Sequence, residues 1–523
     1  MSQCATCGAF SISNSDESDF AIPASALTRI SELLATNEPP HEPELPLIRS
    51  VAQKTAGELA SVGAQISRLR DQLSQLEEKQ TALAEYHAQT ARILSPMRRI
   101  PMEILGEIFS WSLPAHGQLD MVHSPWVLTH VSRLWRAVAV FKSSLWSRLY
   151  LDFSHEQKYS LTMARTQIER AHTLKIAFWG CHRPDSRSQV DFLELLLDHS
   201  TVWEEFRLQL TRALIPPMAA CRGHFPLLRR VWVQWDGPES QAAMASVDFL
   251  RMAASLVEIC VYSRHRFVPT LLPSTHQLTR YTIDAPWTMH YELLKSLPNL
   301  HEVRIIRSFE RGVPWPPAGQ LIHLLYLRCM YVSHVECLDY LRAPSLQTIG
   351  FKSRRNVTTR RHLEPFVTRS SCVFRRLCIV GLPDVQTTER ILQQYPSITG
   401  LAVWIMDLKT QNQDTERDVL ATFLTHFTIS DSARILPRIS NLALACRNAD
   451  AISYPLYLDM IDSRWSARDC ALKDAELLLP NALADPDTEF LARMAILRNH
   501  GMHISHLLGD IALERIDQWL EVP

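Results

Sequence analysis

The sequence lacks an excess of charge of either sign. Its 523 residues include 54 basic and 55 acidic side chains, so the formal net charge is -1 at pH 7. This balance gives no overall field that would hold the protein on nucleic acid or on an anionic membrane. We therefore expect neither nucleic acid nor a membrane among its partners.

Long apolar runs are absent as well. No run approaches the roughly 20 apolar residues that span a bilayer, and the first residues lack the basic and apolar regions of a signal peptide. We expect a soluble protein that is cytoplasmic and/or nuclear. The 11 cysteines are scattered singly, which favours reduced thiols over a disulfide framework. Cys4 and Cys7 form a C-x-x-C, but no second Cys or His pair lies nearby, and this disfavours a metal or redox site.

Catalytic motifs are missing too. The sequence contains no G-x-S-x-G, no P-loop, no Gly-rich dinucleotide fingerprint and no H-E-x-x-H. His500, His503 and His506 have a spacing that suggests a metal site, but Gly501 interrupts the helix and no carboxylate or Cys completes a ligand set. We expect no metal, no cofactor and no enzymatic activity.

Residues 49–94 carry a heptad pattern. They follow residues 1–48, which are rich in Ser, Asp, Glu and Pro and are predicted to be mostly disordered. The pattern predicts a long helix with an apolar seam, which the residues between 59 and 83 supply. The seam consists of Leu59, Val62, Ile66, Leu69, Leu73, Leu76 and Leu83, with the polar Gln80 among them. Two alternatives remain for it, self-association through residues 59–83 or packing on the protein's own surface.

Residues 95–150 predict a small helical module with more apolar residues than so short a unit can bury. A helix begins after Pro101, because proline is well tolerated at the start of a helix. A second helix brings Val131, Leu134, Trp135 and Val138 onto one stripe. Such a stripe needs a partner.

The module contains I-P-x-E-I-L-x-E-I-F, then V-S-R-x-W-R-A-V-A, then the pair Leu145 and Trp146. With these motifs in this order it resembles an F-box, the adaptor-docking module of cullin-based ubiquitin ligases. A heptad helix that leads directly into such a module is similar to the arrangement in many fungal F-box proteins. The resemblance implies docking on a Skp-family adaptor, and through it on cullin, by seven residues: Pro101, Ile104, Leu105, Ile108, Phe109, Val131 and Trp135.

Residues 151–453 repeat the template P-x-[LI]-x-x-[VIL]-x-[VIFL]. It begins at Pro226, Pro298, Pro344, Pro396 and Pro437, and degenerate copies without proline lie between these matches. The first four prolines recur at multiples of a unit of roughly 24 residues, inside the 20–29 range of leucine-rich repeats. One short strand and one amphipathic helix per unit predict a mixed α/β fold, a leucine-rich-repeat-like solenoid with a parallel sheet on its concave side. A single row of strands should run through Val231, Val303, Ile349 and Leu401.

The last segment, residues 454–523, returns to helical periodicity, and we expect it to form a helical cap on the repeats. Two groups of side chains are candidate binding residues in the repeats. The first is a basic cluster after a predicted strand, which is either a site for an acidic or phosphorylated peptide or a solvated loop. It consists of Arg354, Arg355, Arg360 and Arg361. The second is any tryptophan whose ring reaches the concave face. The candidates are Trp179, Trp203, Trp232, Trp235, Trp287, Trp315 and Trp404.

The combined pattern predicts a substrate-recognition subunit of a Skp-cullin-F-box ubiquitin ligase. The F-box would dock on the adaptor, and the repeats would bind a protein substrate. The alternative is a protein-interaction scaffold, built from the coiled coil and the repeats, that does not recruit a ligase. Whether the protein captures an adaptor distinguishes the ligase subunit from the scaffold.

Overall fold

The computed structural model divides into two compact units, residues 1–101 and 102–523, which are described separately below. It describes the following residues: 2–3, 10–11, 24–36, 38–114, 119–123, 125–154, 158–181, 187–221, 225–235, 249–263, 272, 277–308, 314–317, 319–353, 359–381, 385–405, 413–429, 438–447, 449–467, 472–481 and 486–519. Cys4 and Cys7 lie outside these residues.

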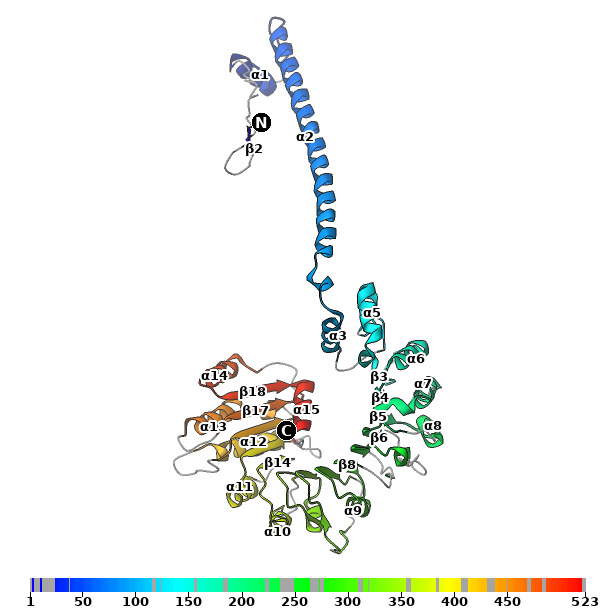
Figure 1. Ribbon diagram of the computed structural model, residues 1–523. Coiled ribbons are helices and arrows are strands. Elements are labelled where there is room, and N and C mark those ends of the chain that lie inside the picture. Colours follow the sequence, from blue (N-terminus) through cyan, green and yellow to red (C-terminus); the bar gives the residue numbers. More distant parts are fainter. Residues whose placement is uncertain are drawn as a thin grey trace. The chain divides into compact units, whose positions relative to one another are not determined.

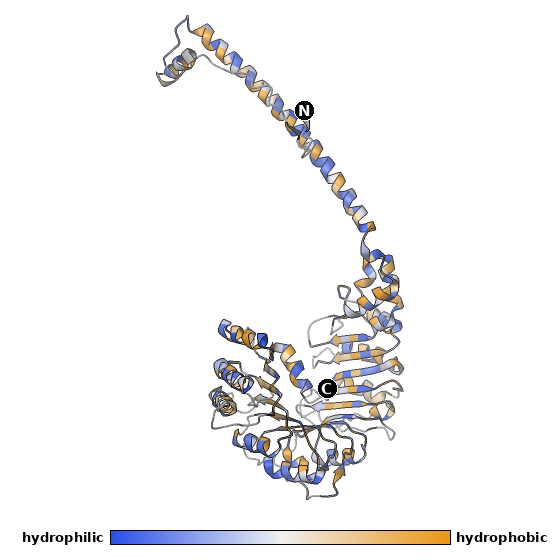
Figure 2. Cartoon of the chain, turned by 60° about the vertical axis from the view of Figure 1, so that its left-hand side comes forward, coloured by the Kyte–Doolittle hydropathy of each residue, from blue (hydrophilic) through white to orange (hydrophobic). Residues whose placement is uncertain are grey.

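The first unit is dominated by one long helix, α2 (Leu45–Ile93), of 49 residues. The sequence predicted a helix over 49–94. None of its side chains is buried, and hydrophobic and hydrophilic residues alternate along its length (Figure 2). Arg29 of the shorter helix α1 (Ala24–Thr36) pairs with Glu44, just before α2, at 2.9 Å. The unit also contains the strand pair β1 (Ser2–Gln3) and β2 (Phe10–Ser11) and the 3-10 turn η1 (Pro96–Arg98).

The second unit begins with a helical module. Its elements are α3 (Met102–Trp111), α4 (Leu128–Val131), α5 (Arg133–Phe141) and the 3-10 turn η2 (Ser143–Trp146). The side chain of Ser132 caps the N-terminus of α5, because its Oγ accepts a hydrogen bond from the Trp135 backbone N–H at 3.2 Å. The chain then enters the sheet directly at β3.

The rest of the second unit is a mixed α/β fold around one parallel sheet of 14 strands, which follow one another in chain order. The strands are β3 (Arg148–Asp152), β4 (Leu174–Trp179), β5 (Trp203–Leu210), β6 (Arg230–Trp235), β7 (Glu258–Ser263), β8 (Arg280–Asp284), β9 (Glu302–Ile306), β11 (Cys329–Val332), β13 (Thr348–Lys352), β14 (Arg376–Val380), β15 (Gly400–Ile405), β16 (Asn441–Cys446), β17 (Asp474–Leu479) and β18 (His503–Leu508). A separate parallel pair joins β10 (Ile322–His323) to β12 (Leu341–Arg342).

Helices and 3-10 turns connect the strands on the outer side of the curved sheet, and among the described helices the last one, α15, lies on the inner side (Figure 1). The helices are α6 (Leu161–Arg170), α7 (Arg187–Leu197), α8 (Ile215–Ala220), α9 (Trp287–Lys295), α10 (Thr359–Ser370), α11 (Val385–Gln394), α12 (Gln413–Phe427), α13 (Tyr454–Ser466), α14 (Thr488–Asn499) and α15 (Gly509–Gln518). The turns are η3 (Ser200–Val202), η4 (Arg212–Leu214), η6 (Phe249–Met252), η7 (Val335–Tyr340) and η8 (Ala449–Ala451). The core lies between the sheet and this outer layer.

The predicted row of parallel strands is present. Successive register pairs connect Val231 through Ile259 and Tyr281 to Val303, and then through β11 to Ile349 and through β14 to Leu401. Alternate residues of each strand face the outer helices, and these carry the aliphatic side chains that the template specified. The template therefore marks the side of each strand that packs into the core.

The prediction of a purely helical cap over 454–523 was wrong. Helices α13, α14 and α15 are present, but β17 and β18 lie between them and extend the sheet by two more strands. The apolar run 477–479 is as short as part of a buried strand, and periodicity does not separate such a strand from a helix segment. In the described residues, no helix is long and apolar enough to cross a membrane.

Candidate interaction surfaces

The helical module is held together by a small core. Leu105 and Phe109 of α3 are buried, and the Phe109 ring lies 4.8 Å from the ring of Trp135 on α5. Gly106 lets the two helices approach, because a Cβ atom there would lie 3.1 Å from the Lys142 side chain. Lys142 Nζ in turn pairs with Glu107 at 2.7 Å. The side chains on the inner face of α3 are therefore buried in the core of the module.

The outer face of α3 is also apolar, and it has no partner in the described structure. Ile104, Ile108 and Trp111 are 53%, 42% and 88% exposed, and their spacing of four and three residues puts them on one stripe. We call these three residues the α3 stripe. Val131 at the end of α4 and Phe141 at the end of α5 are exposed as well. So much apolar surface on a small module indicates a docking site.

The seven residues proposed for adaptor docking therefore divide into two groups. Pro101, Ile104, Ile108 and Val131 are exposed, whereas Leu105 and Phe109 are buried and Trp135 is half-buried. Leu105 and Phe109 shape the docking surface from inside and do not face a partner. Trp111 was not among the residues predicted from the sequence, although it continues the spacing of Ile104 and Ile108.

Tryptophans join the module to the first strands of the sheet. The Trp126 indole N–H donates to Gln167 Oε1 at 3.1 Å, and the Gln167 amide donates to the Arg148 carbonyl at 2.6 Å. The Arg170 guanidinium lies 4.4 Å from the centroid of the Trp146 ring, as in a cation–π contact. Trp146 itself is fully buried. The module and the sheet thus share one rigid junction.

The inner face of the sheet carries a row of alternating charges. One residue from each of six adjacent strands belongs to it: Lys175, Glu205, Arg230, Glu258, Arg280 and Glu302. We call this row the charge ladder. Lys175 and Arg230 contact Glu205 at 3.0 and 2.8 Å. Further along, Arg230 and Arg280 lie 3.9 and 3.6 Å from Glu258, and Arg280 lies 3.2 Å from Glu302. Each charge of the ladder is neutralised by its neighbours.

The charged residues of this ladder occur at a fixed position in the sequence repeats, which the template left unspecified. Arg230 and Glu302 each follow the proline of their repeat by four residues, immediately before the first core position of the strand. The continuous ladder ends after β9, because this position holds Cys329 in β11 and Thr348 in β13. Charged residues return there singly, as Arg376 in β14 and Asp474 in β17.

The inner face of strands β14 to β17 carries small and apolar side chains that are covered, beside the polar residues Arg376, Asn441, Asp474 and Glu476. In β4 buried and half-buried residues alternate, whereas in β15 every residue except Trp404 is buried. The cover is α15, the helix after the last strand. Burial raises the pKa of the Cys378 thiol, which lies beneath α15, to about 12, so this thiol is neutral at physiological pH.

The tryptophans divide between the core and the inner face. Trp203, Trp235 and Trp287 are buried in the core. Trp179 and Trp232 project from the inner face with ring centroids 5.2 Å apart, and Trp404 packs near α15. Trp315 lies outside the strands, with its ring 5.5 Å from that of Trp287.

The basic cluster is only partly described. Arg354 and Arg355 lie outside the described residues, while Arg360 and Arg361 are exposed on α10, where Arg360 pairs with Glu364 of its own helix at 3.2 Å. His500, His503 and His506 were considered as metal ligands on their spacing. Of these, His503 contacts Asp474 at 3.0 Å. Within the described ranges, no group of three or more His, Cys, Asp or Glu residues is arranged to hold a metal ion.

No protein-family model matches this chain, and no curated protein matches it significantly. Its function is therefore argued from the two surfaces above, the α3 stripe and the inner face of the sheet.

Proposed function

We propose that the protein is the substrate-receptor subunit of a cullin-type ubiquitin ligase, with an F-box-like module followed by a leucine-rich-repeat-like solenoid. The observation that carries this proposal is the unpartnered α3 stripe on a module that leads directly into a long parallel sheet. The resemblance of this module to an F-box supports a Skp-family adaptor as the partner. In this role the protein would act in the cytoplasm and/or nucleus.

The α3 stripe has enough apolar surface for such docking. Full burial of one large apolar side chain contributes about 1.5–3 kcal/mol, and part of this sum offsets the entropy lost on association. Ile104, Ile108 and Trp111 together supply a compact apolar anchor, and Leu105 and Phe109 hold the helix that presents it.

The protein itself need not be an enzyme in this role. It would act by proximity, holding a protein substrate on the sheet while a partner enzyme, recruited through the adaptor and cullin, transfers ubiquitin to a substrate lysine. No cofactor enters such a mechanism.

Co-purification tests the proposal. The full-length chain is co-expressed with a Skp-family adaptor and cullin, as wild type and as the Ile104→Asp variant. We expect wild type to capture the adaptor and Ile104→Asp to lose at least about tenfold in affinity, because a charge would enter the docking surface. Ile511→Asp is the matched control, because this isoleucine on α15 is similarly exposed, at 64%. Absence of capture by wild type, or equal capture by both variants, contradicts the proposal.

The alternative function, an interaction scaffold, is favoured by a different observation, the exposed heptad seam of α2. We propose that residues 59–83 associate with a second copy of the chain, with Gln80 paired across the seam. The molar mass of the purified chain tests this by sedimentation, with Leu69→Asp expected to shift a dimer to monomer. A dimer that captures no adaptor favours the scaffold. A wild-type mass equal to that of one chain contradicts self-association.

A further inference from the structure

The C-terminal helix α15 occupies the inner face of the sheet. Its apolar side consists of Ala512 and Ile516, followed by Trp519 just after the helix, and all three are buried. They pack on small and aliphatic residues of strands β14 to β17. These are Cys378, Val380, Ala402, Ala445 and Leu478. We call this group of five residues the inner seat. The inner seat therefore accepts an amphipathic helix with anchors at i, i+4 and i+7.

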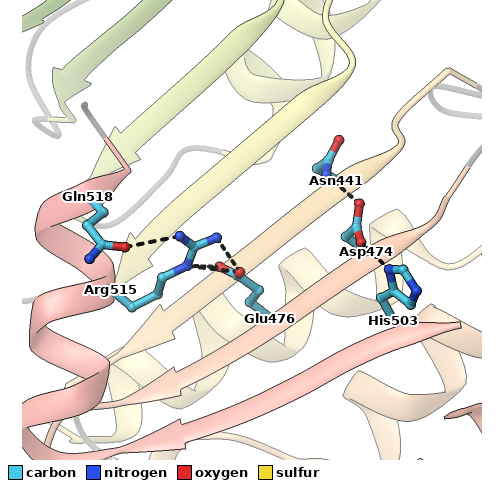
Figure 3. Close-up of polar contacts among 6 residues, drawn as sticks. All are labelled: Asn441, Asp474, Glu476, His503, Arg515 and Gln518. Atoms are coloured by element: carbon cyan, nitrogen blue, oxygen red, sulfur yellow. Dashed lines mark hydrogen bonds and ion pairs between the residues drawn. The ribbon is translucent and has the colours of Figure 1, made fainter. Parts of the chain in front are cut away.

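Two arginines hold the helix at the rim of the inner seat. Arg515 of α15 donates to both carboxylate oxygens of Glu476, with its shortest contact at 2.6 Å (Figure 3). Arg304 of β9 donates to the Asp517 carbonyl at 2.6 Å. The carbonyls of the last helical turn carry partial negative charge and lack partners within the helix, so a cation is favourable there. The seat thus fixes the direction of the helix as well as its apolar side.

The fit of α15 to this seat is incomplete. The buried indole N–H groups of Trp519 and Trp404 have no hydrogen-bond partner within the described part of the chain, and burying an unpaired donor is unfavourable. A pocket of about 250 Å³ lies beside the helix, lined in part by Arg376, Arg515 and Trp519. A ligand with a polar group near the two indole N–H groups could supply the hydrogen bonds that α15 does not make.

Few side chains of the helix itself are buried. Within its ten residues α15 buries only two side chains, whereas five are buried in α13. Ile511 and Leu513 face solvent. An isolated helix of this length is unstable in water, so α15 depends on the seat for its stability. Because α15 follows the last strand, its release would break none of the backbone hydrogen bonds between strands.

We propose that the inner seat is a recognition surface for an amphipathic helix of a partner protein, and that α15 is its internal competitor. The partner helix carries a small residue, an aliphatic residue four positions later and an aromatic residue after three more, with an arginine to pair with Glu476. Describing this partner as the substrate rests on the proposed ligase function. The binding surface itself does not.

A labelled peptide with the sequence of residues 509–519 tests this on the full-length chain. In wild type, the tethered α15 competes at high effective concentration and binding is weak. Arg515→Glu places two carboxylates against each other and releases α15, while Glu476 stays available to the peptide. We expect this variant to bind the peptide at least about tenfold more tightly than wild type, measured by fluorescence anisotropy.

Reversed charges give the specificity control. The Glu476→Arg chain also releases α15, but it should bind the peptide made with Arg515→Glu and reject the unmodified peptide. Ile516→Asp releases α15 through the apolar contact and provides a third opened chain. Hydrogen exchange of residues 509–518 reports the release in each variant.

Failure of all three opened chains to bind their matched peptide overturns the proposal, as does equally tight binding to wild type and Arg515→Glu. Unchanged exchange protection of α15 in all three variants overturns it too, because the helix would then not be displaceable. Adaptor capture by the wild-type chain is measured separately. Its absence removes the ligase role, whereas the peptide result stands or falls independently.

Discussion

The two halves of the sheet carry different side chains on their inner face. Strands β4 to β9 present the charge ladder, in which each ion is paired with the next strand and remains partly exposed. Strands β14 to β17 present small and apolar side chains beside the charged Arg376, Asp474 and Glu476, and the chain covers the apolar ones with its own helix. A ladder whose charges already neutralise one another offers little free energy to a ligand. The second half therefore has the larger apolar surface on which a ligand can bind.

The sharpest test of this comparison places the same charge on each half. Ala402 lies buried beneath α15, whereas Ala177 lies half-buried on the first half, and both are inner-face alanines. We expect Ala402→Asp to lower the free energy of unfolding by about 3 kcal/mol, because an unpaired carboxylate would be buried. Ala177→Asp should cost less than about 1 kcal/mol, because water reaches it and Arg207 is its register neighbour.

Urea unfolding at neutral pH measures both variants. Equal losses of stability would contradict the comparison, because they would mean that α15 does not shield the second half from solvent. Hydrogen exchange of α15 in Ala402→Asp shows in addition whether the charge is accommodated by release of the helix.

Asp284, the last residue of β8, is the exception in the charged half. It is buried, and burial raises its pKa from 3.8 to about 6, although its Oδ1 accepts the Ser308 backbone N–H at 2.9 Å. A carboxyl group whose pKa is higher in the folded state destabilises the fold progressively as pH rises from about 4 to about 6. Above that range the penalty is complete.

We therefore expect Asp284→Asn to raise the free energy of unfolding by about 2 kcal/mol above pH 7, since two pKa units set an upper limit near 3 kcal/mol. The gain should vanish near pH 4, where the carboxyl group is protonated in both states. Asp152→Asn is the control, because Asp152 ends strand β3 and its carboxylate accepts the Ser154 N–H at 2.8 Å. A gain that does not depend on pH would contradict this assignment.

The sequence predicted the core side of the sheet better than its inner face. The proline template marks positions such as Val231 and Leu401, because each strand must bury its own aliphatic side chains against its own helix. That requirement is local and leaves a pattern of period two. The ladder was equally periodic, at the position before each core residue, but the template left this position open.

The seat of α15 could not be predicted in the same way. Ala512 and Ile516 indicate an amphipathic helix, but its partner strands lie 34 to 138 positions earlier in the sequence, and helical periodicity says nothing about which surface is covered. The α3 helix shows a related limit. Both of its faces are apolar, so spacing alone did not separate the buried Leu105 from the exposed Ile104.

The smallest expected effect concerns the charge ladder itself. Glu205→Lys would place a third cation between Lys175 and Arg230, and like charges on neighbouring strands destabilise a sheet. We expect a loss of about 1 kcal/mol at low ionic strength, falling to a few tenths at about 1 M salt, because exposed charges are screened. Glu292→Lys on the exposed side of α9 should cost less at either salt concentration. If the halves differ as described, salt should restore the stability of the Glu205→Lys variant but not that of Ala402→Asp. Screening acts on exposed ions and not on a carboxylate beneath α15. A loss at Glu205 that salt leaves unchanged would show that the ladder is held by packing, and the contrast between the two halves would then lose its electrostatic basis.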